Sequence, residues 1–146
     1  MTRIDKHEYF LRMAELAALR GTCARRKVGC VLVDKNNHVL ATGYNGVPQG
    51  DRHCIDNPCP GAAHKSGTGL SECQAVHAEQ NALLQCHDVQ AIQTAYCTAS
   101  PCVTCMRMLA NTEVRAIFYR ETYPHHEAFQ LANRIGIDMV HLPEKS

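Results

Sequence analysis

Two short segments carry side chains that could bind a metal ion and move a proton. The first is His77-Ala78-Glu79, and the second is Pro101-Cys102-Val103-Thr104-Cys105. Cys102 and Cys105 stand three residues apart, so a helix that starts there places both sulfurs on one side of its first turn. An imidazole and two thiolates suit zinc, and three protein ligands leave a fourth position for water, as in a catalytic site. A carboxylate two residues after the histidine could take that water's proton.

Helix starts at both segments would also have an electrostatic consequence. Each helix would direct the partial positive charge of its N-terminus at the metal. That charge favours thiolates over thiols and, together with a metal, lowers the pKa of bound water. Taken alone, Cys102 and Cys105 could also form a redox pair of the thioredoxin type, although such a pair needs no upstream histidine and glutamate.

The two segments together resemble the zinc signature of the cytidine deaminase superfamily, and further segments resemble its deoxycytidylate (dCMP) deaminases. The segments that carry the resemblance are residues 23–29 (CARRKVG), 43–48 (GYNGVP), 53–54 (HC), 77–82 (HAEQNA), 100–105 (SPCVTC) and 121–123 (ETY). They extend over nearly the whole chain. The resemblance implies a catalytic Zn²⁺ held by His77, Cys102 and Cys105, with Glu79 as the group that carries protons.

The same resemblance implies a reaction and a set of substrate contacts. The reaction is the hydrolytic deamination of dCMP to dUMP and ammonia, which feeds thymidylate synthesis. The Ala78 N–H would hold the base carbonyl, the Ser100 carbonyl would receive the exocyclic amine, and Asn45 would contact the sugar. Tyr123 would close over the base. Arg26, within a short basic run, is the candidate for the phosphate, which needs cationic donors.

Most of these residues also have an ordinary structural explanation. Ser100, followed by a proline, is a typical N-cap of a helix. Asn45 precedes a glycine and could be a turn residue with a left-handed backbone, although we expect the sugar contact. The basic run 25–27 could be a solvated face, and Tyr123 could be a packing or surface aromatic.

A second group of cysteines suggests a structural metal site. Residues 45–74 hold five glycines and three prolines, and so long a connection is uncommon unless it is functional or cross-linked. The ligand-type residues that remain are Cys23, Cys54, Cys59 and Cys73, with His53 and His64. Some dCMP deaminases that this chain resembles hold a second zinc here. We therefore expect a second, structural Zn²⁺, with scattered reduced thiols as the alternative.

The resemblance also implies regulation. Enzymes similar to this chain are homo-hexamers, activated by dCTP with Mg²⁺ and inhibited by dTTP at a site apart from the zinc. The corresponding residues here are Tyr44, Gly46, Asn81, Gln85 and Asp88. We expect Gln85 and Asp88 to lie one and two turns along the helix that carries Asn81.

Composition excludes several classes of protein. The chain has 146 residues, 45% of them hydrophobic, and a formal net charge of +1, which predicts one domain over residues 1–146 and argues against a polyanion-coating or membrane protein. Residues 1–6 lack the apolar stretch of a secretory signal, so we expect a cytoplasmic location, in the host if a virus encodes the chain. Nine cysteines make a poor disulfide framework. Cys30, Cys86 and Cys97 are expected to be small buried hydrophobes.

Hydrophobic spacing and turn residues predict the elements that position these groups. A first helix is expected to start with a capping box at Asp5 and Glu8 and to stop at Gly21. Strands are expected over 27–33, 38–44, 94–98, 114–119 and 137–141, and further helices over 76–86, 102–111 and 126–134. An antiparallel hairpin followed by β-α units predicts an α/β fold. The resemblance specifies three α-β-α layers with a mixed five-stranded sheet.

Two other functions remain as alternatives. One is another deaminase of the superfamily, acting on a free nucleoside, a guanine-like base or tRNA, although the neutral charge balance argues weakly against tRNA. The other is a non-catalytic zinc module that binds nucleotides. Such a module would be expected to lack the proton carrier that Glu79 supplies.

Overall fold

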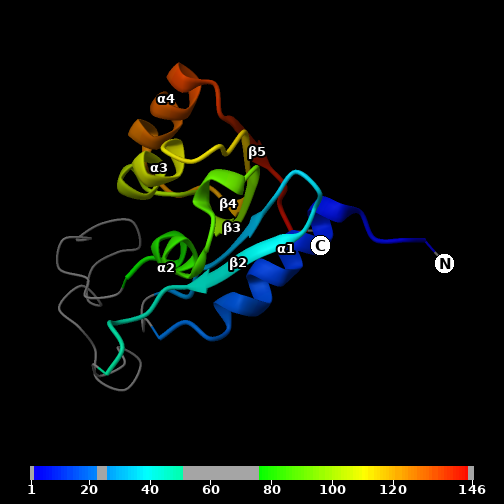
Figure 1. The fold of residues 1–146 in the computed structure, drawn as a ribbon, viewed down its shortest axis with the longest axis vertical. Coiled ribbons are helices and arrows are strands. Elements are labelled where there is room, and N and C mark those ends of the chain that lie inside the picture. Colours follow the sequence, from blue (N-terminus) through cyan, green and yellow to red (C-terminus); the bar gives the residue numbers. More distant parts are fainter. Residues whose placement is uncertain (1, 23–25, 51–75, 145–146) are drawn as a thin grey trace.

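A mixed sheet of five strands runs through the middle of the protein (Figure 1). Its strand order is β2-β1-β3-β4-β5. The strands are β1 (Gly29–Val33), β2 (Val39–Tyr44), β3 (Thr94–Ala99), β4 (Ala116–Glu121) and β5 (Asp138–His141). β1 is antiparallel to both neighbours, whereas β3, β4 and β5 are mutually parallel. This computed structural model describes residues 2–22, 26–50 and 76–144.

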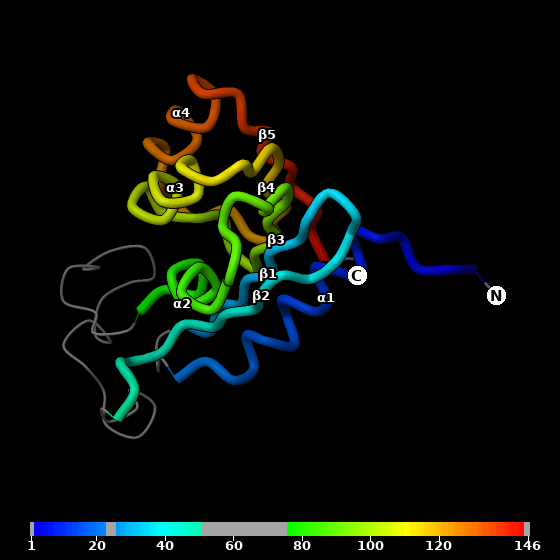
Figure 2. Tube along the Cα trace, in the orientation of Figure 1, coloured from blue at the N-terminus to red at the C-terminus, as the bar shows by residue number. Residues whose placement is uncertain are grey.

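Helices cover both faces of the sheet (Figures 1 and 2). The helices are α1 (Lys6–Ala18), α2 (Ala78–Gln85), α3 (Val103–Ala110) and α4 (His126–Ile135), with a short 3-10 helix η3 (Val89–Ala91) before β3. α1 packs on one face against β1 and β3, and α2 packs on the other against β2 and β1, with α3 and α4 beside it. The predicted three-layer fold is therefore confirmed. Within the described ranges, no helix has the length and apolar character needed to cross a membrane.

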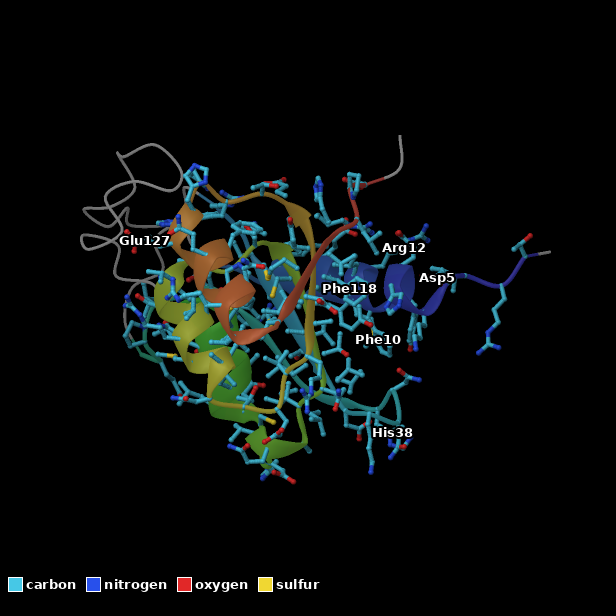
Figure 3. All side chains as sticks on the ribbon, turned by 90° about the horizontal axis from the view of Figure 1, so that it is seen from above. Asp5, Phe10, Arg12, His38, Phe118 and Glu127 are labelled. Atoms are coloured by element: carbon cyan, nitrogen blue, oxygen red, sulfur yellow. The ribbon has the colours of Figure 1, made fainter. Side chains whose placement is uncertain are left out.

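The two faces of β1 belong to two separate apolar cores. Leu32 packs in the core under α2 and α3. Val31 and Val33 pack in the core under α1, together with Phe10 and Phe118, which lie close together in Figure 3. Because β1 is buried on both faces, all five of its residues are buried and its sequence is an unbroken apolar run.

Three cysteines behave as parts of these cores. Cys30 and Cys97 face each other across β1 and β3, are fully buried, and have sulfurs 3.8 Å apart. Cys86 is half-buried at the end of α2 and packs against the same core. The expectation that these residues are small hydrophobes is confirmed for Cys30 and Cys97 and only partly so for Cys86.

Two glycines allow helices to approach the hairpin closely. A Cβ at Gly29 would lie 1.9 Å from the carbonyl oxygen of Ala14 in α1. A Cβ at Gly43 would lie 2.3 Å from the carbonyl oxygen of Ala78 in α2. Both positions therefore require glycine. The second contact fixes the first turn of α2 directly against β2.

The start of α1 differs in part from the sequence prediction. Asp5 caps the helix as expected, since its carboxylate accepts from the N–H groups of His7 and Glu8. Glu8, however, pairs with Arg120, at 2.6 Å, instead of completing a capping box. The nearly buried Arg120 guanidinium also binds Glu15, at 2.8 Å. Arg120 donates two bonds to the two carboxylate oxygens of Glu8, a bidentate pair that joins α1 to β4.

Candidate metal centre and surrounding site

One end of the sheet gathers most of the residues that the sequence singles out. Strands β2, β3 and β4 end there, and the antiparallel β1 begins there. Asn45, Ser100 and Tyr123, which follow these three strands, therefore lie at the same end as Arg26, which precedes β1. Figure 3 shows Glu127, near the start of α4, on the side of the molecule opposite to Asp5. Ligands of open α/β sheets bind at this kind of edge.

A histidine and two cysteines meet where two helices begin. His77 is the N-cap residue of α2, Cys102 is the N-cap residue of α3, and Cys105 lies in the first turn of α3. The Nδ1 atom of His77 lies 3.2 Å from the sulfur of Cys105 and 3.5 Å from that of Cys102. Tetrahedral zinc, with Zn–S near 2.3 Å and Zn–N near 2.0 Å, separates its sulfur and nitrogen ligands by about 3.5 Å. Both the donor atoms and their spacing therefore fit zinc.

Backbone contacts hold this group in place. The backbone N–H of His77 donates to Oε1 of Gln80 at 2.8 Å, which closes the start of α2. Cys102 and Cys105 are buried. Across the described part of the chain, one group of three histidine, cysteine or acidic side chains has all its ligand atoms within 4.8 Å of one another. It consists of His77, Cys102 and Cys105.

Hydrogen bonds couple the protonation of the three groups. Bonds from Cys105 and then His77 stabilise the thiolate of Cys102 and lower its pKa to about 3. The same bond raises the pKa of Cys105, and the Cys102 thiolate raises the pKa of His77. One thiolate is therefore already present, and the helix N-termini favour it further. A divalent metal would displace the remaining protons on binding.

Glu79 lies beside this group, in the first turn of α2. Its side chain forms a hydrogen bond with Cys105, and the residue is only 4% exposed. Burial raises its pKa above the usual carboxyl range. A buried carboxyl with a raised pKa is suited to proton transfer. The preceding residue, Ala78, is the first residue of α2 and is also buried.

Asn45 is a buried connector between two segments. Its Oδ1 accepts from the N–H of Val28, and its Nδ2 donates to the carbonyl oxygen of Arg26, both at 2.7 Å. The alternative of a left-handed turn residue is wrong, because Asn45 does not have a positive φ. In the described ranges, Asn37 is the one non-glycine residue that does. Asn45 instead continues the hairpin, with its N–H bonded to the carbonyl of Val28.

Ser100 is not the N-cap of α3, contrary to the structural explanation offered by the sequence. The helix begins two residues later, with Cys102 as its N-cap. The Ser100 hydroxyl instead accepts from the N–H of Tyr123 at 2.7 Å, and its N–H donates to the carbonyl of Glu121. These two bonds tie together the residues that follow β3 and β4.

Tyr123 contacts a cation, Arg26, and an imidazole, His125, that sequence reasoning did not single out. The guanidinium carbon of Arg26 lies 4.6 Å from the centre of the Tyr123 ring. The ring of His125 stacks on Tyr123 with centroids 5.0 Å apart and an interplanar angle of 9°. Arg26 also pairs with Glu121 at 2.7 Å. The run Tyr-Pro-His-His directly after a strand was the available signal for His125. We call Arg26, Tyr123 and His125 the basic–aromatic cluster.

The residues expected to bind an effector fall into two places. A hollow of about 380 Å³ lies between the end of β2 and α2. Its lining includes four of them: Tyr44, Gly46, Asn81 and Gln85. Nδ2 of Asn81 donates to the carbonyl of Tyr44 at 2.8 Å and so closes one wall. The expectation that Asp88 continues the same helix is wrong, because α2 ends at Gln85 and Asp88 caps η3, where its side chain accepts from the N–H of Gln90.

The expected second metal site falls outside the described residues. This applies to all four cysteines named for it, Cys23, Cys54, Cys59 and Cys73, and to the two nearby histidines. Arg25 of the basic run also lies outside them.

The fold and the His-Cys-Cys group at two helix starts define a class of zinc-binding protein. The family described as the cytidine and deoxycytidylate deaminase zinc-binding region matches residues 4–121. The chain belongs to this family.

Named relatives agree with this assignment. The chain is 42% identical over 126 residues to the deoxycytidylate deaminase of Mycobacterium phage D29, which covers 82% of this chain and 97% of the relative. It is 41% identical over 119 residues to the deoxycytidylate deaminase of Schizosaccharomyces pombe, over 79% of this chain but only 37% of that protein. The chain therefore spans about two-fifths of the length of its yeast relatives.

A solved structure shares the fold over nearly the full length. The dCMP deaminase of cyanophage S-TIM5, solved in complex with dCMP and dUMP, has a TM-score of 0.73 and 27% sequence identity to this chain. The match covers 97% of this chain and 100% of that one.

Proposed function

We propose that this protein catalyses the zinc-dependent hydrolytic deamination of dCMP to dUMP and ammonia. The observation that carries the proposal is the position of Glu79, a buried carboxyl with a raised pKa in hydrogen-bond contact with the His77, Cys102 and Cys105 group. A zinc module without catalysis would have no need of a buried acid beside its metal ligands. The relatives named for dCMP deamination support this substrate.

The roles of the chain's own residues follow from their positions. His77, Cys102 and Cys105 hold the zinc, which when bound makes water a nucleophile at neutral pH. Glu79 takes a proton from the attacking water and passes it to N3 of the base. The water oxygen bonds to C4, the bond from C4 to the exocyclic nitrogen breaks, and a further proton through Glu79 lets the amine leave as ammonia.

The base is oriented by backbone groups at two helix starts. The N–H of Ala78 donates to the base carbonyl, and the carbonyl of Ser100 accepts from the exocyclic amine. The hydroxyl of Ser100 already accepts a hydrogen bond from the N–H of Tyr123. Tyr123, whose N–H makes that bond, is proposed to approach the base with its ring.

Asn45 keeps its proposed contact with the sugar, although with less of its side chain than expected. Each of its two polar atoms already bonds to the backbone of residues 26–28. One amide hydrogen and one lone pair remain for a sugar hydroxyl. Arg26 supplies a fixed cation for the phosphate.

The hollow beside α2 is proposed as the effector site. At about 380 Å³, it is within the usual range for a small-molecule site. We assign dCTP with Mg²⁺ as activator and dTTP as inhibitor, in a homo-hexamer, with Tyr44, Gly46, Asn81 and Gln85 as contacts. Asp88 is omitted because it caps η3. A second, structural zinc at Cys23, Cys54, Cys59 and Cys73 remains part of the proposal.

Comparison of three candidate substrates tests the reaction. The purified zinc-loaded protein is assayed with dCMP, deoxycytidine and guanine, and ammonia release is followed for each. We expect kcat/KM for dCMP to exceed that for deoxycytidine by more than about a hundredfold, because a site built for polar groups rejects an analogue that lacks them. Preference for deoxycytidine or guanine would favour another deaminase, and no turnover at full zinc content would favour a non-catalytic module.

A further inference from the structure

His125 has an unexplained buried nitrogen. Its Nε2 is buried and has no hydrogen-bond partner among the described residues. Within the described ranges, it is the one buried side-chain nitrogen or oxygen atom in this state. Leaving such an atom unpaired costs free energy, so a buried unpaired atom in a native protein calls for an explanation, such as a bound water, ion or ligand. His125 is also the N-cap residue of α4, but its side chain makes no capping bond. Capping therefore does not explain this histidine.

The position of His125 connects it to the reaction site. Its ring stacks on Tyr123, whose N–H is held by Ser100. Ser100 lies two residues before Cys102, one of the three proposed metal ligands. The stacking of His125 on Tyr123 and the bond from Tyr123 to Ser100 therefore connect the histidine ring to the segment proposed to receive the base.

The chemistry of the basic–aromatic cluster defines what could pair with this nitrogen. Arg26, at the same ring, offers only donors and a permanent positive charge. The histidine adds an N–H donor, and both side chains contact the Tyr123 ring. Glu121, which pairs with Arg26, has a side chain that is 72% exposed and can yield to a stronger anion at little cost. A phosphate monoester accepts hydrogen bonds from donors of both kinds.

We propose that His125 is a specificity-determining residue that donates a hydrogen bond from Nε2 to the 5′-phosphate of the nucleotide. This inference rests on the proposed function. It assigns to His125, with Arg26, the distinction between a nucleoside monophosphate and the free nucleoside. The base and the metal are handled by other residues, so the effect of His125 falls on binding of the phosphate and not on the chemical step.

Paired substrates and paired variants test the role. His125→Ala removes the donor, His125→Gln keeps an N–H donor, and His126→Ala is the matched control, because His126 is the exposed neighbouring histidine at the start of α4. Each variant is assayed with dCMP and deoxycytidine after circular dichroism has checked its fold. We expect His125→Ala to raise KM for dCMP about tenfold, the usual loss for one charge-assisted bond. Its kcat should stay within about twofold, and kcat/KM for deoxycytidine should be unchanged.

The controls separate a phosphate contact from a structural role. His126→Ala should leave the ratio of the two substrates unchanged, and His125→Gln should recover part of the dCMP preference. Parallel losses with both substrates, or an unchanged ratio in His125→Ala, would overturn the proposal. If His125→Ala does not fold, the same ratio in His125→Gln decides, since a flexible amide that cannot stack on Tyr123 must still reduce it.

A binding measurement keeps this inference distinct from the proposed reaction. Calorimetric titration with dUMP and deoxyuridine requires no turnover. If the wild-type protein deaminates neither dCMP nor deoxycytidine, the proposed reaction fails. His125 is then still supported if wild-type protein binds dUMP more tightly than deoxyuridine and His125→Ala loses that difference. Equal losses of both ligands would contradict it.

Discussion

The side-chain amide of Asn45 donates to the carbonyl oxygen of Arg26 at 2.7 Å, while its oxygen accepts from the N–H of Val28. One buried side chain thus fixes the backbone of the segment that enters β1. The guanidinium of Arg26 then reaches Tyr123 from a backbone that cannot shift freely. Gly21 lies against the same amide, since a Cβ there would be 2.8 Å from Oδ1 of Asn45.

Asn45→Ala should therefore lower both stability and activity. It removes two hydrogen bonds and leaves two backbone groups without partners, which should cost about 2–4 kcal/mol in the free energy of unfolding. Urea denaturation of the variant measures this cost. Asn133→Ala, on the exposed face of α4, is the control and should change it by less than about 0.5 kcal/mol. Equal effects of the two substitutions would contradict the structural role of Asn45.

Glu79→Gln should abolish turnover while retaining metal. The amide keeps the shape of the side chain but cannot accept the proton of water, and a positioned acid–base group contributes about 10²–10⁴-fold. Glu127→Gln is a matched control, because Glu127 holds the same position in the first turn of α4 but is exposed. Both proteins are assayed with dCMP, and their zinc is measured by atomic emission. A Glu79→Gln protein with a tenth of the wild-type rate would show that another group carries the proton.

Cys105→Ser should remove one zinc ion per chain and all measurable deamination. The substitution deletes one of two sulfur ligands whose distances fit a tetrahedral ion. Cys86→Ser is the comparison, because Cys86 is a half-buried cysteine outside the metal group. Zinc content and activity are measured on the same preparations. Full zinc content in Cys105→Ser would remove that residue from the ligand set.

Cys54→Ser addresses the second metal. The wild-type protein should contain one to about two zinc ions per chain, the upper value applying when the additional cysteines form a closed site. In that case the variant should lose zinc and thermal stability while keeping most activity at low temperature. A wild-type protein with a single zinc, and no fall in Tm for the variant, would remove the second site.

Acid should weaken the junction of α1 and β4. The Arg120 guanidinium lowers the pKa of Glu8 from the ordinary 4.5 to about 2. The unfolded chain therefore binds this proton at higher pH than the folded one. The stabilisation is complete above about pH 4.5 and is lost as the pH falls toward 2. Unfolding free energies of wild type and Glu8→Gln, measured from pH 7 to pH 2, should converge over this interval.

The exposed Glu113 supplies the comparison for that pH series. Glu113→Gln should follow the wild-type curve throughout. A constant difference between wild type and Glu8→Gln down to pH 2 would show that the ion pair with Arg120 does not set the acid response.

The hollow beside α2 should control the response to nucleoside triphosphates. In the absence of effector, plots of rate against dCMP should be sigmoidal, and dCTP with Mg²⁺ should move them to lower substrate concentration. Gln85→Ala should reduce that shift, since coupling between sites is typically only 1–3 kcal/mol. Gln90→Ala, exposed beyond the end of α2, should respond as wild type. A monomer with hyperbolic kinetics, unaffected by dCTP or dTTP, would refute regulation and leave the zinc chemistry in place.

Much of the fold could be predicted because local patterns and tertiary contacts agree. The unbroken apolar run of β1 and the helix starts at His77 and Cys102 appear in the structure within two or three residues of their expected positions. The errors have two causes. Ser100 and Glu8 were assigned by local capping rules, but partners distant in sequence determine what they bind. Asp88 was placed by extending the helix that carries Asn81, but that helix ends at Gln85.

His125 shows the other limit of sequence reasoning. Its residue type and position in a loop gave no distance to Tyr123 and no indication that one ring nitrogen would be buried without a partner. Likewise, the resemblance that implied a sugar contact for Asn45 could not reveal that the segment before β1 already uses both polar atoms. Both properties depend on contacts between segments remote in sequence.

The metal group also lies across a boundary in the order of assembly. His77 belongs to α2, which packs on the β1–β2 hairpin, whereas Cys102 and Cys105 belong to the later run of β-α units. Pairing β1 with β3 closes a long loop between the two parts and is entropically costly. An ion bound by residues of both parts would slow unfolding by holding the two parts together. Its removal should speed the separation of the two parts far more than it slows the folding of either one.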